Sequence, residues 1–371
     1  MSASAPRVLP PVPTAPGLVV AVVGPTATGK SDLAIALALA LDGEVVNADA
    51  LQLYRGMDVG TAKVPPAARR GVPHHVLDVL DPAEEASVAD YQALARAAVA
   101  DVVARGRRPV VVGGSGLYVR ALLDHLDFPG TDAAVRARLE ERVEREGARA
   151  LHAELERVDP VAAASIGPRN ARRVVRALEV VALTGRPYSA HLPRHAYAVP
   201  ALQLGLDCDR AVLDARVERR VARMWADGLV DEVRGLAARG LGRTASRAVG
   251  YAEVLAHLRG ERDEDAARAD VVAGTRRLAR KQMGWFGRDP RVHWLDAQEG
   301  DLLGAALAAV ARADGLVAAG ASADDLRPDG PTDGPTDGPT DGPTDGPGAG
   351  DRGPVRRPLG SGPGAARTLD A

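Results

Sequence analysis

An octapeptide at residues 24–31, GPTATGKS, contains the residue types that bind phosphate groups. It follows the apolar run LVVAVVG and precedes SDLAIALALALD, a segment rich in helix-forming residues. In this setting backbone N–H groups and a helix N-terminus face phosphate oxygens, Lys30 supplies positive charge and Ser31 can ligate Mg²⁺. The sequence therefore predicts a P-loop that binds a diphosphate, formed by Gly24, Pro25, Thr26, Ala27, Thr28, Gly29, Lys30 and Ser31.

A carboxylate, Asp49, ends a second apolar run, GEVVNAD at residues 43–49. Open α/β sheets bind ligands at the carboxyl ends of their strands, so Asp49 is expected close to the P-loop. There it could hold a metal ion or accept a proton as a general base. The alternative is that Asp49 only caps the turn that follows. The residues alone leave both interpretations open.

The elements that must position these residues alternate between strand and helix. Short apolar runs predict buried strands, and the segments between them have helical periodicity. Such alternation indicates an α/β fold: a P-loop, nucleotide-kinase-like core with a parallel sheet flanked by helices. Strands are predicted at 18–24, 43–49, 108–114 and 202–209, an apolar segment at 292–296, and helices at 87–105 (opened by Ser87), 210–239, 246–259 and 263–286.

Apolar strand runs are absent from about 126 to 198, where helical periodicity occurs with many arginines and glutamates. We interpret 126–199 as a small helical domain inserted between two parts of the core, 17–125 and 200–319. A leader at 1–16 rich in proline and small residues, and a tail at 320–371 with DGPT repeats, are predicted to be disordered. The tail is expected to bury nothing.

Within the predicted insertion, RNARRVVRALE places several arginines at helical spacings that share one face, which suits contact with backbone phosphates. The alternative is an ordinary solvated amphipathic helix. These arginines are Arg169, Arg172, Arg173 and Arg176.

Charge and composition restrict the possible functions. The 47 basic and 49 acidic groups include five basic and nine acidic ones at 320–371, so residues 1–319 have a formal charge of +2. A single cysteine, Cys208, permits neither an internal disulfide nor a cysteine-rich zinc site. Adjacent His74 and His75 lack a second ligand cluster and are interpreted as structural. With no apolar run of about 18 residues, a cytoplasmic protein without a membrane partner is expected.

Longer strings identify the chain as a member of a known family. With GPTATGKS, the string VVNADALQLYRGMDVGTAKV (45–64) resembles the signature of the tRNA dimethylallyltransferase family, and matches continue in order across roughly residues 18–300. They include PHHVLDVLDP, VVVGGSGLYVRALL, VDPVAAASIGPRNARRVVRALEV, SRAVGYAEVL and TRRLARKQMGWF. The family's fold, a nucleotide-kinase-like core with a helical insertion, agrees with the pattern of elements above.

The resemblance implies an activity. It is transfer of the dimethylallyl group from dimethylallyl diphosphate to the exocyclic N6 of the adenosine immediately 3′ of the anticodon. The products are N6-dimethylallyladenosine and diphosphate. The implied partners are the tRNA anticodon stem-loop and dimethylallyl diphosphate, and the implied cofactor is Mg²⁺. The resemblance also implies a nucleotide-binding P-loop of the ATP-binding type and a monomeric protein.

The resemblance also assigns roles to residues. Asp49 matches the general base, and Thr26 and Arg247 match active-site positions, with Arg247 near the diphosphate. Positions that contact tRNA in the family are matched by Asp49, Ala50, Leu51, Gln52, Ser115, Arg136, Arg172, Arg173 and Arg176, with Arg276, Arg277, Arg280 and Lys281 in support. Ala50, Ser115, Gly284 and Gly287 depart from the commoner family residues, which puts local tRNA contacts in question.

Three alternatives remain. A small-molecule kinase would use the same P-loop but leaves the 45–64 string unexplained. A non-catalytic RNA-binding protein would need the arginine helix but neither Asp49 nor Arg247. An enzyme that prenylates free adenine nucleotides would have little use for the arginines of the insertion.

Overall fold

The computed structural model describes residues 17–126, 128–191, 195–321 and 326. The predicted leader and nearly all of the predicted tail lie outside the described residues. Six parallel strands form one sheet in the order β3-β2-β4-β1-β5-β6. The predicted α/β class with a parallel sheet is confirmed. The strands are β1 (Val19–Val23), β2 (Gly43–Asn47), β3 (His74–His75), β4 (Arg108–Val112), β5 (Ala201–Asp207) and β6 (Val292–Asp296).

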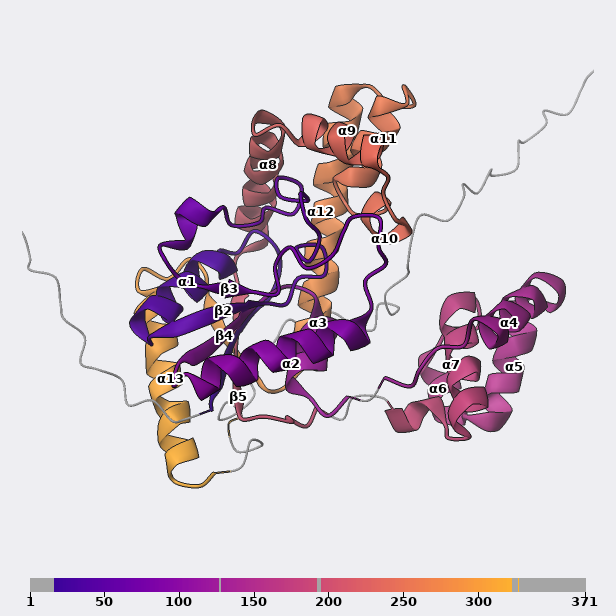
Figure 1. Ribbon diagram of the computed structural model, residues 1–371, viewed down its shortest axis with the longest axis horizontal. Coiled ribbons are helices and arrows are strands. Elements are labelled where there is room, and N and C mark those ends of the chain that lie inside the picture. Colours follow the sequence, from indigo (N-terminus) through magenta and orange to yellow (C-terminus); the bar gives the residue numbers. More distant parts are fainter. Residues whose placement is uncertain (1–16, 127, 192–194, 322–325, 327–371) are drawn as a thin grey trace, which may run out of the picture. The chain divides into compact units, whose positions relative to one another are not determined.

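Helices cover both faces of this sheet (Figure 1). On one face, Val20 and Val22 of β1 pack in a cluster with α1 (Lys30–Ala40) and α13 (Leu302–Ala318). On the other face, Val19, Ala21 and Val23 pack with α2 (Val88–Ala104) and α3 (Gly116–Leu123). Alternate side chains of a strand point to opposite faces, which explains why this strand is a continuous apolar run.

A further helical layer follows β5. The segment predicted as one helix over 210–239 is two, α8 (Arg210–Ala226) and α9 (Leu229–Arg239), separated at Gly228, which has a φ of +93°. The segment predicted as a helix over 246–259 is helical in α11 (Tyr251–Leu258), which follows the four-residue helix α10 (Arg243–Ser246). Helix α12 runs from Glu264 to Phe286. Helices α9 and α11 share an apolar cluster with Tyr54 and Met57, so the loop after β2 packs on this layer.

The segment between α3 and β5 contains four helices with an apolar cluster of their own. They are α4 (Ala133–Glu146), α5 (Ala148–Val158), α6 (Pro160–Ser165) and α7 (Ala171–Thr184). At the root of the segment, the Ala198 N–H donates to Leu123 O at 2.7 Å and the His125 N–H donates to Ala196 O at 3.1 Å. The chain therefore leaves and re-enters the core at one paired position.

Several features were not predicted. The strand β3, the helices α3 and α13, and two short 3₁₀ helices, η1 (Pro66–Arg69) and η2 (Tyr188–His191), had no assignment from periodicity. Leu326 is 3% exposed and packs in the same cluster as α1 and α13. His293 Nε2 donates to Leu326 O at 3.1 Å. The prediction that residues 320–371 bury nothing is therefore wrong at Leu326.

Candidate active site

The P-loop joins β1 to α1, as the sequence predicts. Gly24 has a φ of +123°, and a Cβ there would lie 2.6 Å from Leu206 O of β5, so the first turn of the loop needs glycine. Gly29, with a φ of +94°, precedes the helix that begins at Lys30. Thr28 Oγ1 donates to Pro25 O at 2.9 Å and closes the loop. The N-terminus of α1 is thereby directed at the space above the sheet edge.

A glutamine that sequence reasoning did not single out holds the loop from outside. Gln282 of α12 is 8% exposed, and its Oε1 accepts the Thr26 N–H at 2.8 Å. Its amide also packs against Gly114, where a Cβ would lie 2.2 Å from Nε2. Gln282 therefore connects the P-loop to the loop after β4. Its position inside TRRLARKQMGWF was a signal, but only the fold shows what it contacts.

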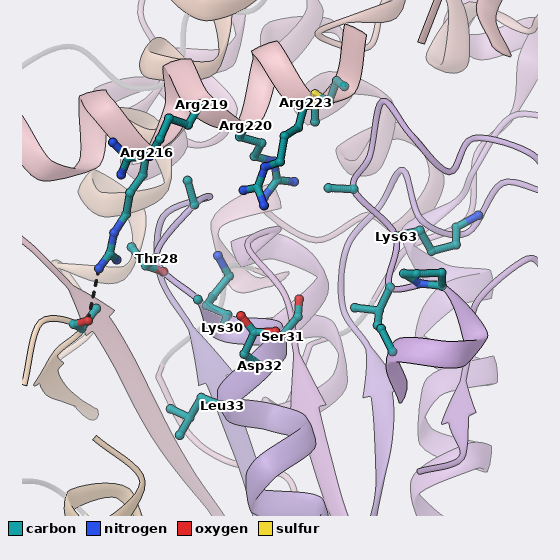
Figure 2. A pocket seen from close by; sticks show the side chains of 18 of the residues that line it. Thr28, Lys30, Ser31, Asp32, Leu33, Lys63, Arg216, Arg219, Arg220 and Arg223 are labelled. Carbon is teal, nitrogen blue, oxygen red and sulfur yellow. Dashed lines mark hydrogen bonds between the residues drawn. The ribbon is translucent and has the colours of Figure 1, made fainter. Parts of the chain in front are cut away.

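The P-loop opens into a cavity of about 1000 Å³ whose opposite wall is α8. Figure 2 shows Thr28, Lys30, Ser31 and Asp32 on one side of this space and the arginines of α8 on the other. Those arginines recur at helical spacings that place them on one face of α8, a pattern that is already visible in the sequence. They are Arg216, Arg219, Arg220 and Arg223.

Two basic side chains in this cavity, Lys30 and Arg220, have lowered pKa values. Burial lowers the pKa of Lys30 to about 7; Arg220 adds to the lowering and Asp49 opposes it. Lys30 Nζ donates to Pro25 O at 2.5 Å. Arg220 is half-buried, its pKa is also lowered by burial, and its Nη2 donates to Thr61 O at 3.3 Å. Two cations so close favour a polyanionic ligand, which would neutralise both.

Asp49 lies at the carboxyl end of β2, half-buried, where its charge affects both Lys30 and Arg220. Its Oδ1 accepts the Leu51 N–H at 2.9 Å, so the alternative that Asp49 caps the next turn is confirmed. That bond engages one oxygen, and among the described residues Oδ2 accepts no hydrogen bond. The cap orients the carboxylate and leaves an oxygen to accept a proton, so the two interpretations are compatible.

The predicted tRNA-contacting residues near Asp49 are brought together. Ser115, which precedes α3, accepts the Ala50 N–H at its Oγ at 3.1 Å. Gln52 Nε2 donates to Thr61 O at 3.2 Å. Leu51 is half-buried beside the apolar cluster of α9 and α11. Ser115 is therefore joined to Ala50, beside Asp49, and Leu51 and Gln52 follow directly in the chain. The tRNA contacts of these residues stay a prediction.

Arg247 is not brought to the cavity. It is exposed at the end of α10 and is absent from the described residues that line the cavity beside the P-loop. Among the described residues, the arginines that line this cavity with the P-loop come from α8. A contact between Arg247 and diphosphate stays a prediction.

The arginines of the insertion fall into two groups. Glu179 is fully buried, and its carboxylate accepts Arg136 Nη2 at 2.6 Å and Arg176 Nη1 at 2.9 Å. Arg176 also donates to Gly130 O and Pro129 O. By contrast, Arg172 is exposed and Arg173 half-exposed on the same helix, α7. Glu179 therefore holds two of the predicted tRNA-contacting arginines, Arg136 of α4 and Arg176 of α7.

The supporting residues of α12 also fall into two groups, one arginine that joins α12 to α8 and three residues that are exposed. Arg276 Nη2 donates to Glu218 Oε1 of α8 at 2.5 Å and Arg276 Nε lies 3.5 Å from Asp214, so this arginine joins two helices. Arg277, Arg280 and Lys281 are exposed.

The two adjacent histidines form β3. His75 Nε2 is 2.6 Å from Glu44 Oε2 and His74 Nδ1 is 2.8 Å from Val72 O, which fits the structural interpretation. Across the described ranges no cluster of three or more acidic, histidine or cysteine side chains could enclose a metal ion. No helix in the part of the chain described is long and apolar enough to span a membrane.

Fold and cavity together define the class: an α/β protein built like the P-loop nucleotide kinases, with a basic cavity suited to a phosphorylated ligand. Comparisons with known proteins narrow this. A family model described as IPP transferase matches residues 52–289, and one described as isopentenyl transferase matches residues 17–77. A protein of Salinispora arenicola named tRNA dimethylallyltransferase is 60% identical over 298 residues, which cover 80% of this chain and 87% of that protein.

A protein of the same name from Kineococcus radiotolerans is 63% identical over 289 residues, covering 76% of this chain and 91% of that protein. The crystal structure of the full-length tRNA isopentenylpyrophosphate transferase from Bacillus halodurans is 38% identical with a TM-score of 0.59, covering 84% of this chain and 98% of that one. A eukaryotic dimethylallyltransferase acting on tRNA has a TM-score of 0.68 at 26% identity over 76% and 74% of the two chains. The chain belongs to the tRNA dimethylallyltransferase family of prenyltransferases, which confirms the resemblance.

Proposed function

We propose that this protein transfers the dimethylallyl group from dimethylallyl diphosphate to N6 of the adenosine immediately 3′ of the anticodon in tRNA. The observation that carries the proposal is the cavity in which the P-loop faces the arginines of α8, with Asp49 beside it. A diphosphate fits the P-loop and the arginines of α8. A proton acceptor close to the diphosphate fits a reaction in which the acceptor must lose a proton.

The chemistry follows from the charges. The bond between C1 of the dimethylallyl group and the diphosphate oxygen breaks, and its electron pair stays on the diphosphate. Lys30 and Arg220 stabilise that charge as it develops, together with the P-loop amides. The adenine nitrogen bonds to C1 and releases a proton, which Asp49 accepts. Thr26, whose N–H is bonded to Gln282, would contact the diphosphate through its hydroxyl.

Mg²⁺ is part of the proposal. Ser31 lines the cavity at the start of α1, where a hydroxyl oxygen can ligate the ion. Mg²⁺ typically takes only one or two protein ligands and completes its shell with phosphate oxygens and waters, so Ser31 beside a diphosphate fits it without an acidic cluster. When bound, the ion would spread the negative charge of the leaving group.

The tRNA acceptor requires an RNA-binding surface, because the target base must leave the stacked anticodon loop to reach Asp49. Residues 50–52 and Ser115 would surround the base, and the exposed arginines of α7 and α12 would contact backbone phosphates. The proposal includes a monomer in the cytoplasm, where mature tRNA is used. Occupancy of the P-loop by ATP is not needed for this reaction.

The test is a transfer assay with a labelled donor. The protein is incubated with dimethylallyl diphosphate, Mg²⁺ and an anticodon stem-loop that has adenosine after the anticodon, and nucleosides are identified by mass spectrometry. Product in the stem-loop, and none with AMP or with guanosine at that position, is expected. Product from AMP would favour a free-nucleotide prenyltransferase. Phosphorylated product with ATP would favour a kinase, and binding without product an RNA-binding protein.

A further inference from the structure

Residues 56–63 form another part of the cavity wall, besides the P-loop and α8. Asp58, Val59, Ala62 and Lys63 line the cavity. The segment has no helix or strand of its own, so its conformation depends on contacts from elsewhere. Those contacts converge on one carboxylate that the mechanism above does not use, Glu232 of α9.

Glu232 accepts three consecutive backbone N–H groups of this segment. Asp58 N and Val59 N donate to Oε2 at 2.9 and 2.7 Å, and Gly60 N donates to Oε1 at 3.1 Å. Tyr251 of α11 donates its hydroxyl to the same Oε1 at 2.6 Å. Successive N–H groups turned to one side form an anion-binding concavity, and here the anion belongs to the protein.

Close packing fixes the segment further. A Cβ on Gly60 would lie 2.5 Å from Tyr251 Cε2, so the backbone rests directly on the tyrosine ring. Lys63, 8% exposed, donates to Tyr54 O at 2.8 Å and pairs with Asp58 and Asp78 at 2.6 Å. The segment is therefore held at both ends.

The next residue, Thr61, shows what holding this segment in place achieves. Thr61 O accepts Arg220 Nη2 at 3.3 Å and Gln52 Nε2 at 3.2 Å. One carbonyl thus orients the half-buried arginine of the cavity and the predicted tRNA contact Gln52. Both side chains donate to this carbonyl, and the three N–H groups just before it are the ones that Glu232 accepts.

We propose that Glu232, assisted by Tyr251, is a positioning residue: it sets the Thr61 carbonyl that orients Arg220 toward the diphosphate and Gln52 toward the acceptor base. The inference rests on the proposed donor site. It predicts a defect in diphosphate binding and in turnover, with a much smaller effect on tRNA affinity. Of the predicted tRNA contacts only Gln52 depends on this carbonyl, and the phosphate-contacting arginines of the insertion do not.

The experiment compares Glu232→Gln with Asp231→Asn in the full chain. Asp231 is the neighbouring acid on α9, with an 82% exposed side chain that pairs only within the helix, so it is a matched control. Glu232→Gln places an amide N–H₂ among N–H donors. We expect weaker binding of inorganic diphosphate by calorimetry and a loss in kcat of about 10–100-fold, as misplacement of about 1 Å can cause. The Kd for the anticodon stem-loop should change far less than the Kd for diphosphate.

Tyr251→Phe, which removes one hydroxyl, should give a smaller defect of the same kind in a protein that melts like the wild type. The inference is overturned if Glu232→Gln behaves as Asp231→Asn. It is also overturned if Glu232→Gln and Tyr251→Phe lower only the fraction of the protein that is active, while the diphosphate Kd and the kcat per active site stay unchanged. Lys30→Ala distinguishes a failure of this inference from a failure of the proposed function. If Lys30→Ala leaves diphosphate binding intact, the assignment of the cavity as the donor site is wrong.

Discussion

Lys30 gives the clearest pH prediction at the scale of single residues. Its pKa is lowered to about 7 by burial, with Arg220 in the same direction, whereas a bound diphosphate interacts with the ammonium form. Above pH 7 binding must therefore take up a proton, and diphosphate affinity should fall as pH rises from 7 to 9, by at most about tenfold per pH unit. Calorimetry in buffers of different ionisation enthalpy at pH 8 measures this uptake.

The control is Lys30→Arg, whose side chain stays charged throughout this range, so its uptake should vanish. Absence of proton uptake by the wild type at pH 8 would show that Lys30 is already charged in the free protein.

Asp49 has two functions that a single substitution can separate. Asp49→Asn keeps an Oδ1 that can accept the Leu51 N–H but removes the base. We expect single-turnover prenyl transfer to fall by about two to four orders of magnitude while the Kd for tRNA and the melting temperature hold. Asp49→Ala should lose stability as well. Near-normal turnover by Asp49→Asn would assign the proton to another acceptor.

At the scale of elements, α7 shows how one helix combines binding and structural arginines. Arg173→Gln should flatten the slope of log affinity for tRNA against log salt by about 0.7–0.9, the effect of one lost phosphate contact. Arg176→Gln should instead reduce the free energy of unfolding by about 1–3 kcal/mol, because Arg176 donates to the buried Glu179 carboxylate and to two backbone carbonyls.

Salt-dependent binding and chemical denaturation of the two variants measure both effects. If Arg176→Gln flattened the slope and kept full stability, Glu179 would be holding that arginine for RNA rather than for the fold.

At the scale of the whole molecule, Leu326 shows that the hydrophobic core includes a residue beyond α13. A chain ending at residue 321 loses a buried leucine and the bond from His293, so it should unfold about 1–3 kcal/mol more easily. A chain ending at residue 330 should match the full-length protein, because DGPT repeats offer no apolar side chains. Denaturant titration of both, with Leu326→Ser in the full chain as control, tests this boundary. Equal stability of the two truncations would contradict it.

Much of this architecture could be predicted from local sequence. Apolar runs that are buried on both faces predict β1, β2, β4 and β5, and Ser87 correctly predicts the start of α2, where its side chain accepts the Asp90 N–H. The P-loop could be predicted because its loop, lysine and helix start are contiguous, so the chain alone brings them together. Elements of two residues, such as β3, have too few side chains to show a period.

The residues of the candidate site also divide into those that lie in short contiguous strings and those that only the fold brings together. Gly24–Ser31 and Asp49 could be named from short contiguous strings, because sheet topology places the ends of parallel strands along one edge. Arg220, Gln282 and Glu232 could not be assigned, since the loop backbone groups that they bind lie 150 or more residues away along the chain. Whether an arginine on a helix meets solvent, a buried glutamate or a phosphate is decided by what the fold packs opposite it. Sequence determined the chemistry that is available, and tertiary contacts decided which charges are neutralised within the protein and which remain directed at a ligand.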